Sequence, residues 1–240
     1  MKGWIYFWTA YRFGHFTVPA CFEELDEVFD RLLFRNDKIL LTHSNALLSD
    51  LGQNLCRRMA DIELYAWYVS EAMKHPDTMV ASVQIGTFLV GHFSACKSLL
   101  DAAAITLANI YSLGLSNKQM DFSRPKFWNQ LKQRQQTVYD RYTPFKGLSN
   151  EVIEWRDSAV HRTTPLVVAH IPDGPDKTPR DKQEIRMVAK PDARFFTVVE
   201  MRNRTPWVDP LHFHRKWRGQ LIRLCEEVCI DIRDSLASLR

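Results

Sequence analysis

The stretch that decides the fold runs from Met79 to Leu113 and reads MVASVQIGTFLVGHFSACKSLLDAAAITLANIYSL. It mixes large apolar residues with many alanines, and it holds no proline. Small side chains let neighbouring helices approach closely, because the distance between packed helices depends on the residues at their contact. We therefore expect a long central helix here, ending at Gly114, around which the other helices pack.

The first half of this stretch raises the question of a membrane span. Residues 78–96 contain no Asp, Glu, Lys or Arg, and a bilayer needs about 20 apolar residues to be crossed by a helix. Gln84, Gly91, His92 and several hydroxyl residues interrupt the apolar run. We interpret it as a buried helix, and we expect no membrane partner.

Helical spacing of apolar residues continues on both sides of the central stretch. His75-Pro76 ends the helix before it, because proline disfavours the α conformation of the preceding residue. Ser149 or Asn150 is the expected N-cap of a helix on the other side. The predicted helices cover residues 22–35, 44–73, 79–113, 126–142, 150–162 and 210–239.

The periodicity changes after Pro165. Three β-like segments follow, Leu166–Ile171, Glu184–Val188 and Arg194–Glu200, and turn-forming residues separate them. They predict a small antiparallel β-hairpin or meander, inserted at about residues 166–200 before the last helix. The fold class is therefore mainly α, a helical bundle with this insertion, and we expect one domain over residues 1–240.

Composition excludes some classes of protein. The 240 residues are 45% hydrophobic and 25% charged, which excludes wholesale disorder. The net charge of +4 permits an RNA or phosphate partner without requiring one. The odd number of cysteines and their apolar surroundings favour buried free thiols in a reducing cytosol. Residues 1–19 have no signal-peptide pattern, so we expect a cytoplasmic protein.

The candidate chemistry lies in residues 154–162, EWRDSAVHR. Cleavage of RNA without a metal needs a group that moves protons, and histidine does this best near neutral pH. It also needs a fixed cation for the charge that grows on the phosphoryl oxygens, and the planar fork of arginine binds phosphate through two hydrogen bonds. His161 and Arg156 supply these two groups, with Asp157 beside them.

The spacing of Arg156 and His161 sets a geometric condition. Residues five apart lie roughly 140° apart around an ideal α-helix and about 7.5 Å apart along it. The two side chains converge only if the long arginine reaches across, if the helix is distorted near its end, or if a second subunit contributes its copy. The structural alternative is a surface arginine and a histidine that caps the carbonyl groups of its own helix.

Arg156-Asp157-Ser158-Ala159-Val160-His161 resembles the motif of the HEPN superfamily, Arg-[Asn/Asp/His]-x-x-x-His on a late helix. The long helix with Ala95-Cys96-Lys97-Ser98-Leu99-Leu100-Asp101-Ala102 and the insertion followed by a closing helix also look like HEPN domains. The helical resemblance covers residues 44–165 and 210–239. The six-residue motif is its specific part, and here Asp157 replaces the commoner Asn.

The resemblance implies a metal-independent endoribonuclease. His161 would act as general acid or base, Arg156 would stabilise the phosphate, and Asp157 would hold the arginine or contact the RNA. Attack by the 2′-hydroxyl would leave 2′,3′-cyclic phosphate ends, without metal or cofactor. HEPN domains are often toxin or defence proteins that act as dimers, which implies a homodimer, an RNA substrate and an antitoxin or other protein partner.

Weaker candidates lie near this motif. Lys97 and Asp101 are four residues apart and share a helix face. Asp101 would orient Arg156 or His161 and Lys97 would hold a phosphate, or else the two form an ion pair within their helix. Arg162 would add phosphate affinity, or it is a solvated arginine.

Histidines elsewhere in the sequence do not indicate a metal site. His212 and His214 have no carboxylate or thiol partners nearby in the sequence, so we expect no metal. His92, among apolar neighbours, is predicted to be a hydrogen-bonded core histidine.

The competing hypothesis is a non-catalytic helical scaffold or binding module. Exposed aromatic residues, Trp4, Trp8 and Trp207, and the β meander would engage a protein partner. The direction of the motif side chains discriminates the two hypotheses. Convergence of Arg156 and His161 in a positive groove or at a dimer seam favours the enzyme. Side chains that point apart into solvent, or that lie beneath the meander, favour the scaffold.

Overall fold

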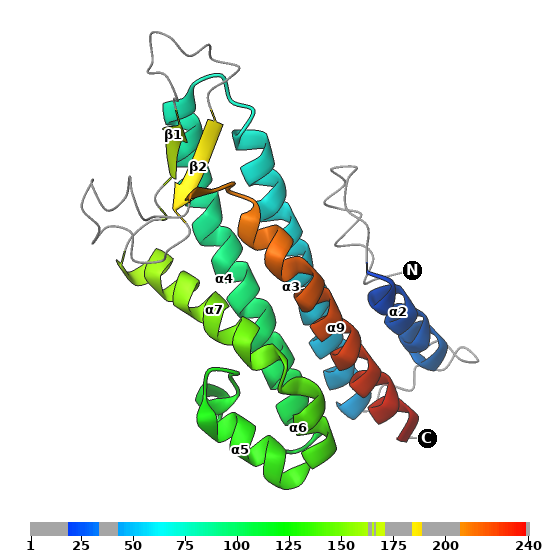
Figure 1. Cartoon of the computed structure of the whole chain (residues 1–240). Coiled ribbons are helices and arrows are strands. Elements are labelled where there is room, and N and C mark those ends of the chain that lie inside the picture. Colours follow the sequence, from blue (N-terminus) through cyan, green and yellow to red (C-terminus); the bar gives the residue numbers. More distant parts are fainter. Residues whose placement is uncertain are drawn as a thin grey trace. The chain divides into compact units, whose positions relative to one another are not determined.

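The computed structural model describes residues 19–33, 43–162, 165, 167–170, 184–188 and 207–238. Helices make up most of these residues, and a small antiparallel sheet precedes the last helix, so the predicted mainly-α class is confirmed. The α-helices in the described part of the chain (Figure 1) are α2 (Ala20–Leu33), α3 (His43–Ala72), α4 (Thr78–Ile110), α5 (Pro125–Arg134), α6 (Gln136–Tyr142), α7 (Phe145–Asp157) and α9 (His212–Ser238).

Two helix boundaries differ from the sequence prediction. The helix expected over residues 126–142 is two helices, because the non-helical backbone of Gln135 (φ −147°, ψ 76°) separates α5 from α6. Helix α7 begins at Phe145 rather than near Asn150, so Ser149 and Asn150 lie inside it and are not N-caps. Pro144 is tolerated directly before this helix, because the first turn leaves its amide groups without intrahelical partners.

The end of α4 is also formed differently. Ser112 adopts the left-handed conformation (φ 48°) that usually belongs to glycine. The amide of Leu113 donates to the carbonyl of Ala108 at 3.0 Å, and that of Ser112 donates to Asn109 at 3.2 Å. This pair of bonds is the Schellman motif. Ser112 therefore terminates the helix, and Gly114 (φ 65°) lies in the turn that follows.

The sheet is a meander of three antiparallel strands, β1 (Val167–His170), β2 (Glu184–Val188) and β3 (Trp207–Val208). Val167 lies opposite Met187, and Met187 lies opposite Val208. The first two strands match the predicted segments. The segment predicted over residues 194–200 lies outside the described residues, so it stays a prediction. The third strand of the described sheet is at Trp207-Val208, where Trp207 is half-buried.

The chain divides into two compact units. The first contains residues 1–61, 96–150 and 219–240, and the second contains residues 62–95 and 151–218. Helices α3, α4, α7 and α9 contribute residues to both units. The division therefore does not separate two continuous pieces of chain, and the expectation of a single domain stays a prediction.

The first unit is organised around aromatic residues and the buried Asp231. Phe122 stacks on Trp128, whose indole N–H donates to the carbonyl of Phe122 at 2.7 Å. Asp231 of α9 is buried, accepts a hydrogen bond from Tyr142 at 2.7 Å and pairs with Arg141 of α6. A buried carboxylate needs such partners, because an unpaired one is strongly destabilising. These contacts fix α6 against α9.

The second unit is organised around Phe93 of α4. Its ring contacts Trp155 of α7 and Phe213 and Trp217 of α9, with ring centroids 5.3 to 6.0 Å apart. All four aromatic residues are buried. Aromatic clusters of this kind bury large apolar areas, and this one fixes the end of α7 that carries the candidate motif.

Helix α4 also meets a membrane criterion. By length and apolar composition alone it is the one helix, among those described, that could cross a bilayer, and the core helices of soluble proteins meet the same criterion. Between Ala95 and Ala108, nine apolar residues have exposed fractions of 7% or less, which are Ala95, Cys96, Leu99, Leu100, Ala102, Ala103, Ala104, Leu107 and Ala108.

Candidate functional site: a widened helical turn with Arg156 and His161

The candidate motif lies where α7 changes its hydrogen-bonding pattern. The α-helix ends at Asp157, and a five-residue π turn, Ser158–Arg162, continues it. A π turn closes hydrogen bonds between residues five apart, so it contains more residues than an α turn. Residues five apart, which diverge on an ideal α-helix, therefore approach one another here. Nη1 of Arg156 lies 3.4 Å from Nε2 of His161.

Of the three routes to convergence, the distorted helix end is the one that the structure shows. The pair forms within one chain, between Arg156 in the last turn of α7 and His161 in the π turn that continues it. Single π turns inside helices are rare and frequently occur at functional sites. The side chains of Arg156 and His161 approach one another and do not point apart. Their position in a positive groove or at a dimer seam stays a prediction.

Asp157 holds the guanidinium from the other side. Its Oδ1 accepts a hydrogen bond from Nη1 of Arg156 at 2.8 Å. The Arg156 side chain keeps 34% of its surface exposed and that of Asp157 keeps 45%, and His161 is exposed as well. Nη1 makes both contacts, and Nε and Nη2 of a guanidinium carry three further N–H groups for an anion. The cation is thus both oriented and accessible.

The contact between the two side chains has a chemical condition. A guanidinium only donates hydrogen bonds, so Nε2 of His161 is a partner for Nη1 of Arg156 in the tautomer that leaves this nitrogen as an acceptor. An acceptor nitrogen beside a fixed cation is the arrangement that a general base needs.

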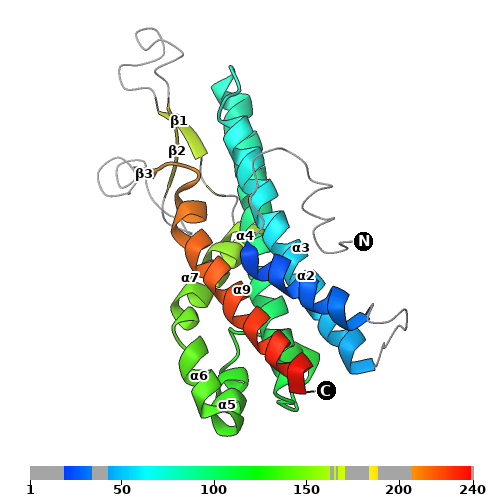
Figure 2. The same ribbon diagram turned by 90° about the vertical axis from the view of Figure 1, so that its right-hand side faces the viewer.

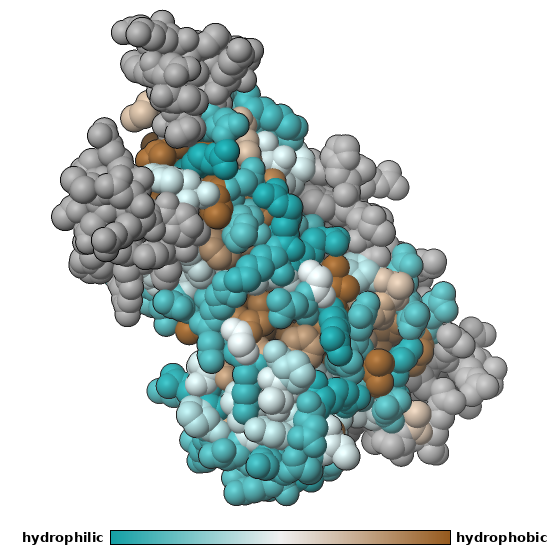
Figure 3. Space-filling view, in the orientation of Figure 1, coloured by the Kyte–Doolittle hydropathy of each residue, from teal (hydrophilic) through white to brown (hydrophobic). Residues whose placement is uncertain are grey.

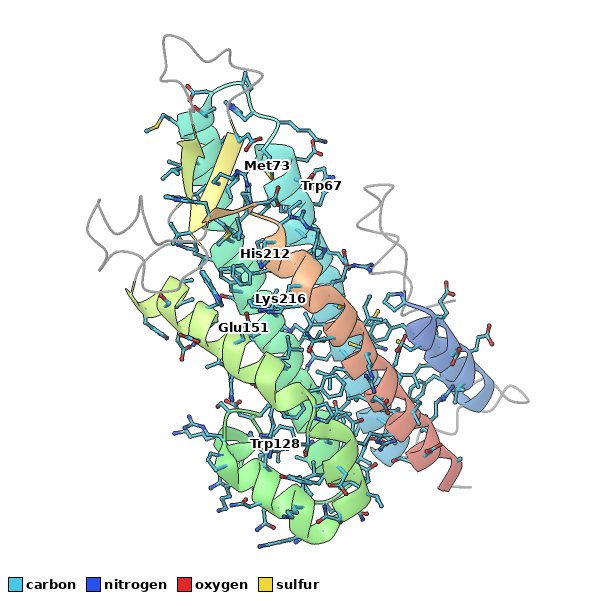
Figure 4. The ribbon with its side chains drawn as sticks, viewed as in Figure 1. Trp67, Met73, Trp128, Glu151, His212 and Lys216 are labelled. Atoms are coloured by element: carbon cyan, nitrogen blue, oxygen red, sulfur yellow. The ribbon has the colours of Figure 1, made fainter. Side chains whose placement is uncertain are left out.

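Buried neighbours fix the direction in which the motif points. Trp155 is buried, and its ring lies 4.4 Å from that of Phe213 on α9. Ser158 and Ala159 are buried too, while Val160 and His161 are exposed. One turn earlier, Glu151 and Lys216 form an ion pair between α7 and α9 at 2.5 Å (Figure 4). The motif is therefore presented outward from an anchored helix.

Lys97 and Asp101 form the ion pair within their helix. Nζ of Lys97 contacts the Asp101 carboxylate and lies 3.3 Å from Oδ2 of Asp121. Burial alone would raise the pKa of Asp121, but the backbone hydrogen bond from Ser123 and the charge of Lys97 outweigh it and lower that pKa. Lys97 is thus already engaged by two carboxylates.

The predicted roles of these residues at the phosphate stay predictions. Lys97 and Asp101 belong to the first unit, and Arg156 and His161 belong to the second. The backbone of Arg162 completes the π turn, and its side chain lies outside the described residues.

Sequence analysis missed a chain of polar groups inside the second unit. Nε2 of His92 lies 3.3 Å from Nδ1 of His214, and Nε2 of His214 lies 3.7 Å from Oε2 of Glu63. Nε of Arg218 donates to the other Glu63 oxygen at 2.7 Å. The partner of His92 confirms it as a hydrogen-bonded core histidine. The four polar groups come from α3, α4 and α9 and lie far apart in the sequence, so no local pattern predicts their contacts.

Burial shifts the pKa values of the two histidines and of Glu63. It lowers the pKa of His92 to about 3, with a further contribution from His214. Burial also lowers the pKa of His214 to about 4, together with the charges of Arg218 and Arg215. The pKa of Glu63 is raised by burial, against the opposing effect of Arg218. Both histidines are therefore neutral at neutral pH.

The described residues contain no group of three or more His, Cys, Asp or Glu that could hold a metal ion. Comparison of the chain with protein-family models, with curated proteins and with solved structures finds no match. The resemblance to HEPN domains therefore rests on the motif and the helical pattern described above, of which the motif is the specific part.

Proposed function

We propose that this chain is a metal-independent endoribonuclease of the HEPN type. The observation that carries the proposal is the approach of Arg156 and His161, which the π turn brings within 3.4 Å on an exposed part of the second unit. A proton-transfer group next to an oriented cation is the minimum that this reaction requires.

The proposed reaction uses each group once. Nε2 of His161 takes the proton of a ribose 2′-hydroxyl, and the resulting oxygen attacks the adjacent phosphorus. The guanidinium of Arg156, oriented by Asp157, stabilises the negative charge on the phosphoryl oxygens. The bond from phosphorus to the 5′-oxygen breaks, and that oxygen receives a proton. The products are a 2′,3′-cyclic phosphate and a 5′-hydroxyl.

The leaving 5′-oxygen needs a proton donor. In the proposed homodimer a second copy of His161, in its protonated form, supplies that proton at the same phosphate. The dimer would thus place a base and an acid on the two sides of the scissile bond.

An RNA substrate also fits the charge of the first unit. Residues 118–146 contain seven Lys or Arg residues and two Asp residues. One of the two, Asp121, is engaged by Lys97, and the other, Asp140, accepts a hydrogen bond from Gln136. We call the exposed cations of this segment the basic face, and they are Lys118, Arg124, Lys126, Lys132 and Arg134.

An aromatic ring lies next to one cation of the basic face. Nζ of Lys132 lies 5.5 Å from the ring centroid of Tyr139, which is half-buried. Nζ of Lys146, outside the basic face, lies 4.6 Å from the ring centroids of Tyr139 and of the buried Trp128. Cations that follow a phosphate backbone, interleaved with aromatic rings, are typical of surfaces that bind single-stranded nucleic acid. The region of α5 and α6 has largely hydrophilic colours in Figure 3.

The test is cleavage of labelled RNA in the presence of EDTA. We expect the wild type to cut, and we expect Arg156→Ala and His161→Ala each to lower the rate at least 100-fold. Matched controls in the same unit are Arg215→Ala and His75→Ala, which should keep the wild-type rate. The cut ends should carry 2′,3′-cyclic phosphate. A folded wild type that cuts only when a divalent metal is added contradicts the proposal.

A second candidate, a non-catalytic binding module, is favoured by one surface. Three apolar residues at the start of α4 are exposed, Met79 by 72%, Val83 by 70% and Val80 by 41%. Exposed apolar clusters mark contact sites with other proteins. Under this alternative the folded wild type cuts no RNA. A photo-crosslinking residue at position 83 then captures a protein that the same residue at position 74 does not.

A further inference from the structure

Four cysteines on three helices of the first unit are close enough to interact electrostatically. They come from α2 (Cys21), α3 (Cys56) and α9 (Cys225 and Cys229), and all four are free thiols. The thiols of Cys21 and Cys229 are joined by a hydrogen bond. Cys225 interacts electrostatically with Cys21 and Cys56. The proposed nuclease reaction uses none of them.

An ion pair fixes α2 against α9 next to these thiols. Nη1 of Arg233 lies 2.8 Å from Oε2 of Glu24. Glu24 follows Cys21 by three residues and Arg233 follows Cys229 by four, so each lies one helical turn beyond its cysteine. Figures 1 and 2 show α2 beside the C-terminal part of α9. The two contacts, one turn apart, place the faces of Cys21 and Cys229 opposite one another.

The two thiols differ in their access to solvent. Cys21 is partly exposed, whereas Cys229 keeps 2% of its surface exposed. The hydrogen bond with Cys21 and burial raise the pKa of Cys229 well above its usual value. A small oxidant therefore reaches Cys21 first, and Cys229 remains a protonated thiol behind it.

We propose that Cys21 and Cys229 are a redox pair, and that oxidation of Cys21 by a peroxide leads to a disulfide that links α2 to α9. Helices from distant parts of the sequence would then be covalently joined. A disulfide of this kind constrains the unfolded chain over a long loop and so stabilises the folded state.

The chemistry takes place in two steps. The sulfur of Cys21 attacks one oxygen of hydrogen peroxide, the O–O bond breaks, and the departing hydroxide takes up the thiol proton to leave as water. Cys21 is then a sulfenic acid. The sulfur of Cys229 attacks the sulfur of this sulfenic acid, the S–O bond breaks, and the hydroxide leaves as water with the proton of Cys229. Two thiols lose two electrons in total, and the peroxide is reduced to two molecules of water.

The position of Cys225 makes it a poorer partner. Cys225 and Cys229 lie one turn apart on the same helix, and a bond between them would join no second element. Cys56 is fully buried. The hydrogen bond to Cys21 selects Cys229 from the three buried thiols.

The experiment counts and maps thiols in the full chain. The reduced protein is treated with hydrogen peroxide at neutral pH, unfolded in denaturant, and alkylated. We expect the number of reactive thiols to fall from five to three, and peptide mapping to join Cys21 to Cys229. Reduction with dithiothreitol should restore all five. The reaction should accelerate as the pH rises, because the thiolate is the attacking form.

Variants distinguish a disulfide between Cys21 and Cys229 from unspecific oxidation of the cysteines. Cys21→Ser and Cys229→Ala should each abolish the disulfide, whereas Cys96→Ala, at a buried position of α4 outside the cluster, should leave it unchanged. Since Cys229→Ala changes the core, the partly exposed Cys21→Ser is the decisive variant. The melting temperature of the wild type should rise reversibly on oxidation, and that of Cys21→Ser should not.

Three results overturn the proposal. They are the retention of five thiols, a disulfide that maps to another pair, and oxidation of Cys21 to sulfinic acid without any disulfide. The same treatment in urea is the final control, since the preference for Cys21 and Cys229 should disappear when the helices unfold.

Discussion

At the scale of a single residue, substitution of Asp157 tests whether the orientation of Arg156 matters for cleavage. Asp157→Ala removes the acceptor of the 2.8 Å hydrogen bond from Nη1. We expect the cleavage rate to fall about tenfold, less than for Arg156→Ala, because the cation remains but loses one of its anchors. Asp157→Asn keeps an acceptor oxygen and should retain most of the rate. Equal losses for Asn and Ala would show that the negative charge, and not the orientation, is what matters.

The histidine pair gives a prediction for the pH dependence of stability. The folded-state pKa values of His92 and His214 lie at about 3 and about 4, below the usual 6.5. Between pH 6.5 and 4 the unfolded chain therefore binds more protons, and the free energy of unfolding falls as the pH falls. Each histidine contributes a slope of at most about 1.36 kcal/mol per pH unit. The raised pKa of Glu63 acts in the opposite direction above pH 4.5.

Urea unfolding at pH 7, 6 and 5 measures this effect. The His214→Gln variant should show a shallower loss of stability between pH 7 and 5 than the wild type. An unchanged slope would mean that the two histidines titrate equally in the folded and unfolded states.

Residue types could be predicted at the motif, but contacts could not. Arg156 and His161 were recognisable because their functional groups suit a phosphate and lie close in the sequence. The polar contacts that link His92 to Arg218 were not recognisable, because the residues that make them come from α3, α4 and α9 and come together only in the folded protein. Fold-dependent contacts of this kind have no local signal in a single sequence.

At the scale of elements, the end of α4 offers a direct test. Ser112 adopts a left-handed conformation that costs a non-glycine residue about 1 to 2 kcal/mol. Ser112→Gly should therefore raise the free energy of unfolding by about 0.5 to 1 kcal/mol, after the entropy cost of glycine.

Gly114→Ala is the matched change at the neighbouring left-handed residue. An added Cβ there meets only Arg134 Nη2 at 3.6 Å, which is ordinary contact, so the backbone conformation alone should lower stability by about 1 kcal/mol. Urea unfolding curves give both values. A destabilised Ser112→Gly would show that the serine side chain stabilises this turn.

The lengths of the long helices were predictable because their apolar residues keep a helical period over many turns. The division of residues 126–142 was not, since Gln135 is neither proline nor glycine and gives no local signal for a break. The π turn had only an indirect signal. Two residues whose chemistry belongs together stood at a spacing that an ideal α-helix cannot bring together.

At the scale of the whole molecule, RNA binding should depend on salt through the basic face. Each phosphate contact to single-stranded RNA contributes about −0.7 to the slope of log K against log salt concentration. Lys126→Gln combined with Lys132→Gln should weaken binding and reduce the magnitude of that slope by about 1.4. Lys74→Gln, in the second unit, is the control. Fluorescence anisotropy with a His161→Ala background measures binding without cleavage, and an unchanged slope would place the RNA elsewhere.

The two units share four helices, and this has a consequence for synthesis on the ribosome. Glu63 and Asp231 both find their arginine or tyrosine partners across long intervals of sequence, and α9 supplies a member to each set. Neither unit can therefore close until α9 has emerged. At a translation rate of 5 to 20 residues per second, the apolar faces of α3 and α4 lack their α9 contacts for roughly ten seconds. The nascent chain should need a chaperone during that interval. A protein truncated before residue 212, where α9 begins, should be insoluble.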